Sequence, residues 1–148
     1  MIPIRLWHYK LFPYLPNKQI VSQWRELCLI FNKGNRFIII NYVYEYPKED
    51  LYKYTLLLLD ELNKRKINIK QWKYFNNYFN DLLYNNIKMD SNIFINHQTP
   101  RYLFQCFVNL QEKYERGQKD FSKHLYENLC EFIYDEYLKN IKIKDLLN

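Results

Sequence analysis

The most apolar helical pattern in the chain is Leu51-Tyr-Lys-Tyr-Thr-Leu-Leu-Leu-Leu-Asp-Glu-Leu62. Large apolar side chains recur at the three- and four-residue spacing of one helix face, at Leu51, Tyr54, Leu58 and Leu62. Further leucines widen this face, so the middle of the helix must be covered on several sides. Pro47 and the carboxylates that follow it fit a first helical turn. We therefore expect a central helix that runs to about Lys66.

Other helices are indicated by cap residues and by apolar residues at helical spacing. Pro16-Asn17 opens a helix that ends near residues 32–34, and Thr99-Pro100 opens another that Gly117 ends. Asn68 is expected to cap a helix through residue 83. The side chains predicted to point inward from it are Trp72, Phe75, Phe79, Leu82 and Leu83. A last long helix is expected over about residues 119–139.

Two segments between these helices have no helical pattern. Residues 37–45 are rich in β-branched and aromatic side chains and are predicted to be extended, although the sequence offers no partner strand. Residues 85–96 are predicted to be a loop. At 148 residues the chain has the length of one ordinary domain. We predict a mainly α fold, a single domain over residues 1–148 built as a bundle of about five helices.

Composition restricts the function classes. The chain has 22 Lys and Arg against 16 Asp and Glu, a formal charge of +6 that favours a polyanionic partner. A surplus of Asn, Ile, Lys, Tyr and Phe and the absence of Ala also fit an AT-rich genome, so positions carry more weight than totals. The 48% hydrophobic content excludes a disordered chain. No apolar run approaches the roughly 20 residues that span a bilayer, and no secretion signal is evident. We expect an intracellular protein, cytoplasmic or nucleoid-associated, that does not bind a membrane.

The cysteines do not indicate a metal site. Cys28, Cys106 and Cys130 form no CxxC pair, are odd in number, and lie beside apolar helix positions. We expect buried free thiols and neither metal nor organic cofactor.

A polar stripe on the first helix is the best candidate for chemistry. Gln19, Ser22, Gln23 and Glu26 follow one another at helical spacing, with Arg25 at the margin. By composition alone such a stripe is a solvated surface, since exposed Arg and Glu are what these faces normally carry.

The order of the residues favours a functional interpretation. The stretch from Leu15 to Leu27, ending Trp-Arg-Glu-Leu, resembles the first helix of the phage-type pyrimidine-dimer DNA glycosylases. The similarity continues from Tyr42 through the helix exit Leu62-Asn-Lys-Arg-Lys-Ile-Asn-Ile-Lys70 and resumes at Ile95-Asn-His97, so that it covers most of residues 4–116. The stretches 5–10 and 101–113 are similar to an uncharacterised bacterial branch of this superfamily.

This resemblance implies a DNA repair glycosylase that is also an abasic-site lyase. Members flip a nucleotide from double-stranded DNA at a damaged or abasic site and attack the sugar C1′ with the N-terminal α-amine. Here that amine belongs to Met1, or to Ile2 if Met1 is removed. Glu26 stands at the position of the acid/base Glu, and Arg25 at that of an Arg that contacts phosphate or lesion. The protein would act as a monomer, as a hydrolase and lyase without a cofactor.

Further residues are possible parts of the site. Arg5 and the cluster Lys64, Arg65, Lys66 and Lys70 are candidates for phosphate contact, while the cluster also complements a helix dipole. His8, Gln19, Ser22 and His97 are possible site residues, although a structural role is at least as common for such a His. The family has a His where this chain has Gln19, and a basic residue where it has Leu29. The alternatives are a catalytically inactive nucleic-acid-binding module on the same scaffold and a structural helical protein.

Overall fold

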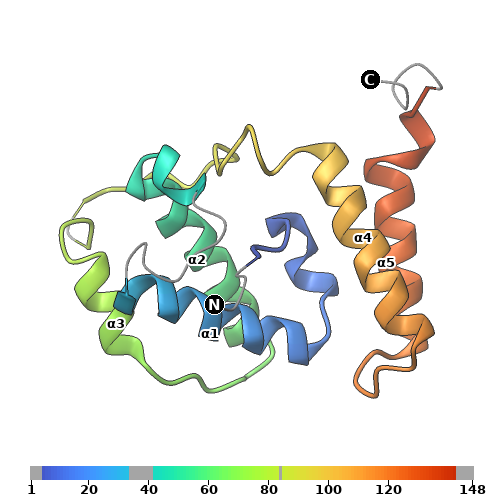
Figure 1. Ribbon diagram of the computed structural model, residues 1–148, viewed down its shortest axis with the longest axis horizontal. Coiled ribbons are helices and arrows are strands. Elements are labelled where there is room, and N and C mark those ends of the chain that lie inside the picture. Colours follow the sequence, from blue (N-terminus) through green and yellow to red (C-terminus); the bar gives the residue numbers. More distant parts are fainter. Residues whose placement is uncertain (1–4, 34–41, 84, 143–148) are drawn as a thin grey trace.

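The structure is a computed structural model that describes residues 5–33, 42–83 and 85–142. The α-helices in this part are α1 (Asn17–Lys33), α2 (Lys48–Lys64), α3 (Trp72–Tyr78), α4 (Pro100–Glu115) and α5 (Lys123–Glu136). Three short 3-10 helices accompany them, η1 (Tyr9–Tyr14), η3 (Tyr42–Glu45) and η4 (Leu138–Asn140). The described segments contain no strand, which confirms the mainly α fold (Figure 1).

Side-chain caps and one glycine set the ends of α4 and the start of α5. The Thr99 hydroxyl accepts a hydrogen bond from the Tyr102 N–H at 3.1 Å, and Ser122 caps α5 in the same way through the Leu125 N–H. Gly117 has φ 82°, the left-handed conformation that ends a helix at low cost. At α1 the Pro16 carbonyl accepts from the N–H groups of Gln19 and Ile20.

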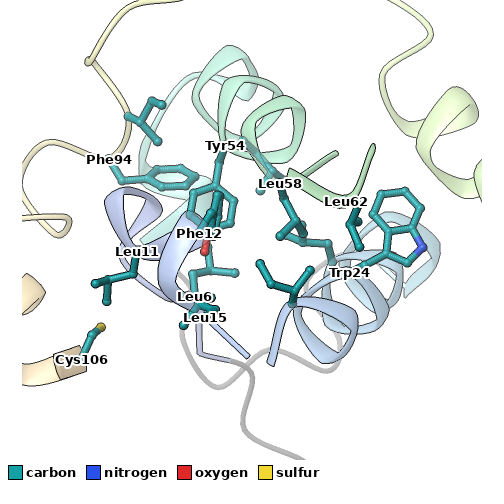
Figure 2. Packing of buried hydrophobic residues seen from close by; sticks show 14 of the residues in the cluster. Leu6, Leu11, Phe12, Leu15, Trp24, Tyr54, Leu58, Leu62, Phe94 and Cys106 are labelled. Carbon is teal, nitrogen blue, oxygen red and sulfur yellow. The ribbon is translucent and has the colours of Figure 1, made fainter. Parts of the chain in front are cut away.

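The core surrounds α2, as its leucine-rich pattern predicts. Tyr54 and Leu58 are fully buried, and Leu51 and Leu62 nearly so. Helix α2 packs against α1, η1 and η3, and α1 also packs against α3 (Figure 1). Figure 2 shows the side chains of α2 meeting Leu6, Leu11, Phe12 and Leu15 from the N-terminal segment and Trp24 from α1. Burial of these side chains is the main source of stability.

The N-terminal segment connects α2 with the pair of helices α4 and α5. Helix η1 packs against α2 on one side and α5 on the other, while α4 packs against α5 (Figure 1). Tyr14 of η1 stacks on Phe132 of α5 with ring centroids 4.6 Å apart. The helices α1, α2 and α4 contribute to one hydrophobic cluster, as expected, with residues of the N-terminal segment among them.

The predicted helix over residues 68–83 is wrong in its extent. Helix α3 begins at Trp72, after Gln71 in a left-handed conformation, and ends at Tyr78. Trp72 is 45% exposed and Leu83 38% exposed, whereas Phe75, Phe79 and Leu82 are buried as predicted. Residues 67–71 carry no helix because the chain crosses α1 here, where the Trp24 indole N–H donates to the Lys70 carbonyl at 2.9 Å.

Two other boundaries differ from the expectation. Of the segment 37–45, residues 37–41 lie outside the described part, and Tyr42–Glu45 is a 3-10 turn rather than extended. The rings of Tyr42 and of Tyr46, which follows the turn, pack against Phe94. Helix α5 begins at Lys123 rather than near 119, because residues 117–120 form a turn bonded to α1.

Cys28 and Cys106 are buried free thiols, and Cys130 is half-buried. No helix in the described segments is long and apolar enough to cross a membrane.

Candidate active site around Glu26

Glu26 lies at a cavity of about 630 Å³ between the N-terminal segment, α1 and α4. Its walls are formed by Arg5, Leu6, Trp7, Glu26, Tyr102, Gln105, Cys106, Asn109 and Lys113. Polar and cationic groups from the N-terminal segment and α4 therefore converge beside one carboxyl group of α1, an arrangement typical of a binding or catalytic site.

The environment of Glu26 alters its proton affinity. Burial raises the pKa of its carboxyl from 4.5 to about 7, and the backbone N–H of Arg5 partly opposes this shift. A carboxyl with a pKa near 7 is populated in both protonation states at neutral pH. It can therefore give or take a proton during a reaction, as a general acid/base requires.

Buried polar side chains hold the N-terminal segment over α1 and α2. The Gln23 amide accepts from the Trp7 N–H at 2.8 Å and donates to the Arg5 carbonyl at 3.2 Å. The Tyr54 hydroxyl donates to the Trp7 carbonyl at 2.6 Å. Because these bonds fix the backbone of Arg5 and Trp7, they fix one wall of the Glu26 cavity.

The same segment is fixed from the α4 side. Gln98 accepts from the Tyr9 N–H at 2.8 Å and donates to the Trp7 carbonyl at 3.4 Å. The Tyr102 hydroxyl donates to the Leu6 carbonyl at 2.6 Å. We call Gln23, Tyr54, Gln98 and Tyr102 the clamp. The clamp holds the backbone next to Arg5, which lines the Glu26 cavity. Met1 and Ile2 lie outside the described residues.

Arg25 points to a different cavity. Together with Lys70, Tyr74 and the apolar side chains of α1 it lines a groove of about 530 Å³ between α1 and the segment 68–74. Arg25 and Lys70 are both exposed there. Two cations on an open groove are chemically suited to a phosphate backbone, and DNA contact by Arg25 and Lys70 stays a prediction.

The remaining residues of the predicted basic cluster differ from one another. Arg65 donates from all three guanidinium nitrogens, to Glu61, Asn17 and the carbonyls of residues 12, 13 and 15. It thereby ties the end of α2 to η1 and α1, a structural role that leaves no N–H group for DNA. Lys64 is paired with Asp60 at 3.0 Å, and Lys66 is exposed.

The structure does not bring His8 or His97 to the Glu26 cavity. His8 is buried; its Nδ1 accepts from the Lys10 N–H and its Nε2 donates to the Gln98 carbonyl. Burial lowers the pKa of His8 to about 4, so this His is neutral. His97 stacks on Tyr42 at 4.2 Å and bonds the Tyr46 hydroxyl at 2.7 Å. Both contacts indicate structural roles.

The polar stripe of α1 faces protein rather than solvent. Gln19 and Gln23 are buried and Ser22 is half-buried. Gln19 exchanges hydrogen bonds of 2.8 and 3.2 Å with the amide of Gln118 at the α4–α5 turn. The interpretation as a solvated surface is therefore wrong, although Gln19 serves the packing of two helices rather than the Glu26 cavity.

The α4 wall of the cavity escaped the sequence analysis. Tyr102, Gln105, Asn109 and Lys113 follow one another at three- and four-residue spacing beside the apolar stripe of α4. The signal was thus the same kind of polar stripe that singled out Glu26 on α1. Gln98 offered no such signal, because it stands in a loop.

A comparison with protein families gives a match to the first half of the chain. The family described as pyrimidine dimer DNA glycosylase matches the chain over residues 4–75. This stretch is therefore similar to the pyrimidine dimer DNA glycosylase family. The resemblance inferred from the sequence is confirmed over this stretch. Neither the curated proteins nor the solved structures give a match.

The glycosylase match contains most of the predicted site. Arg5, Arg25, Glu26 and the cluster 64–70 lie inside it, as does Gln23 of the clamp. The α4 wall and Gln98 lie beyond its end. The family description implies DNA as the substrate, and the cavity that holds Glu26 combines matched and unmatched parts of the chain.

Proposed function

We propose that this protein is a DNA repair glycosylase and abasic-site lyase that acts on pyrimidine-dimer or abasic sites in duplex DNA. The observation that carries the proposal is Glu26, a carboxyl with its pKa raised to about 7, in a cavity bounded by the start of the chain. The family match over residues 4–75 supports the same reaction class.

The nucleophile in this proposal is the N-terminal α-amine, of Met1 or of Ile2 after Met removal. An α-amine has a pKa of about 7.7 to 8.0 and is partly unprotonated at neutral pH. Met1 is four residue steps from Arg5, and these steps can span at most about 14 Å, since each extended residue covers about 3.6 Å. Because Arg5 lines the cavity, this reach includes the surroundings of Glu26.

The N-terminal amine and the Glu26 carboxyl perform different steps of the proposed reaction. The amine nitrogen attacks C1′ of the flipped nucleotide and the bond to the base breaks, which yields an iminium after the sugar ring opens. Removal of a C2′ proton then expels the 3′ phosphate by β-elimination, and water releases the amine. Glu26 is suited to the proton transfers, as acid in its neutral form and as base when ionised.

Substitution of Glu26 tests this division. Glu26→Gln keeps the size of the side chain but removes the titrating group. We expect it to lower single-turnover strand cleavage at an abasic site by roughly 10² or more, with DNA affinity within a few fold of wild type. Glu112→Gln, on the exposed side of α4, is the matched control and should cleave normally. Equal rates for the Glu26 variant and wild type would remove Glu26 from the mechanism.

A further inference from the structure

Four cationic side chains line a cavity of about 490 Å³ at the α4–α5 turn. They are Lys18 from the first turn of α1, Lys113 and Arg116 from the end of α4, and Lys119 from the turn itself. We call these four residues the turn surface. The other residues that line the cavity are Gly117, Gln118 and Asp120.

The turn surface is held in place by bonds to α1. The Lys18 N–H donates to the Asp120 carboxylate at 2.8 Å, and the Gln118 amide donates to the same carboxylate at 2.7 Å. The reciprocal amide pair of Gln19 and Gln118 fastens the turn on its buried side. Gly117, with φ 82°, allows the chain to reverse here. The four cations thus stand on a fixed frame rather than on a free loop.

The positive charge of the turn surface is balanced by one carboxylate only. Asp120 is the sole acidic residue that lines this cavity, and both of its oxygens already accept the bonds from Lys18 and Gln118. Among the described residues, none of the four cationic side chains lies in an ion pair with an acidic side chain within 4.0 Å. The surface is therefore suited to a ligand with several negative charges.

Lys113 connects the turn surface to the Glu26 cavity, because it lines both. From Tyr102, at the Glu26 cavity, to Arg116 the helix rises about 21 Å, at about 1.5 Å per residue. This distance equals about six base pairs of duplex at about 3.4 Å each. A strand whose damaged nucleotide enters the Glu26 cavity would follow this side of α4 to the turn.

We propose that the turn surface binds the phosphate backbone of duplex DNA on one side of the damaged nucleotide. This inference rests on the proposed function for the position of the lesion, but three of its four residues, Lys113, Arg116 and Lys119, lie outside the family match. The proposal assigns part of the DNA contact to the turn surface rather than to the cluster 64–70. In that cluster Arg65 bonds other parts of the fold and Lys64 is paired with an acid.

The salt dependence of DNA affinity tests the proposal. The probe is an undamaged duplex and a duplex with a stable abasic analogue. Each phosphate contact contributes about 0.9 to the slope of log affinity against log salt. The double variant Arg116→Gln/Lys119→Gln is expected to lower the magnitude of this slope by about 2 on both duplexes. Two further abasic duplexes each end at the lesion, so that each lacks the DNA on one of its two sides. The change in slope should disappear on one of them and persist on the other.

The control is the double variant Lys123→Gln/Lys139→Gln. It removes the same charge from α5 and η4, where Lys123 is paired with Glu127 and Lys139 with Asp135. Its slope should stay near that of wild type. An unchanged slope for Arg116→Gln/Lys119→Gln, or an equal change in both double variants, would overturn the proposal.

The two proposals fail separately. If Arg116→Gln/Lys119→Gln leaves the salt slope unchanged while the wild-type protein cleaves abasic sites, the turn-surface proposal is overturned and the lyase mechanism is not. If this double variant lowers the salt slope but the wild-type protein cleaves no abasic site, the proposed function is overturned and DNA binding by the turn surface is supported.

Discussion

Arg25 and Glu26 are neighbours in the sequence but face different cavities. Glu26 lines the cavity with Arg5 and Lys113, whereas Arg25 lines the groove with Lys70. Successive residues of an α-helix are rotated by about 100°, so one helix can present two groups to two sites. In the proposed function, this geometry would separate proton transfer, at Glu26, from contact with the DNA backbone, at Arg25.

Arg25 and Arg65 should therefore respond differently to the same change. Arg25→Gln is expected to flatten the salt dependence of DNA affinity by roughly one unit without a loss of stability. Arg65→Gln should leave the slope near wild type but lower the free energy of unfolding, because the carbonyls of Phe12 and Leu15 lose their donor. Titrations at several salt concentrations and urea unfolding measure both. A flattened slope for Arg65→Gln alone would reverse the two assignments.

Stability should depend on pH through Glu26. Because its folded pKa of about 7 exceeds the ordinary 4.5, the native state binds more protons than the unfolded state between these values. The free energy of unfolding therefore falls as pH rises through this window. Glu26→Gln lacks the effect, so its stability relative to wild type should be higher at pH 8 than at pH 5 by urea unfolding. A difference independent of pH would show that the carboxyl is not perturbed.

The centre of the core should be sensitive to the loss of volume. Leu58 is 0% exposed in the middle of α2, and Leu58→Ala is expected to lower the free energy of unfolding by about 2 to 5 kcal/mol. Leu83→Ala, at a position that is 38% exposed, should change it by about 0.5 kcal/mol or less. Denaturant unfolding of both variants compares them, and a loss below half a kcal/mol for Leu58→Ala would contradict the described packing.

The clamp should control local motion of the N-terminal segment. Gln98→Ala removes the acceptor of the Tyr9 N–H and is expected to cost about 1 to 3 kcal/mol, the scale of a buried polar group left without a partner. Amide hydrogen exchange at Tyr9 should accelerate more than exchange in the middle of α2. Unchanged protection at Tyr9 would show that Gln98 does not hold the segment.

Patterns within one helix were readable from the sequence, and contacts between segments were not. The leucine spacing of α2 and the Thr99 cap of α4 could be predicted because both depend on residues within a few positions. The extent of α3 could not, since it is set by the crossing of residues 67–71 over Trp24. The burial of Gln19 and Gln23 likewise depends on partners far away in the chain.

The candidate site follows the same division. Glu26 and Arg25 were found through a stripe and a resemblance, both local to α1. The clamp residue Gln98 lies in a loop and acts on Trp7 and Tyr9, which are about ninety positions away. Arg65 was assigned to DNA from its charge alone, and only its partners in three dimensions identify it as part of the fold.

We propose above all that the N-terminal amine forms a covalent intermediate with DNA, in a reaction assisted by Glu26. Borohydride reduction in the presence of abasic or pyrimidine-dimer duplexes, followed by mass mapping of the trapped peptide, tests it most directly. We predict a trapped species that maps to Met1, or to Ile2 if Met1 is removed, and that persists in Glu26→Gln. A trap at Lys10 would keep the lyase and change the nucleophile. Tight binding of both duplexes without any trapped species would contradict the account and favour a nucleic-acid-binding module.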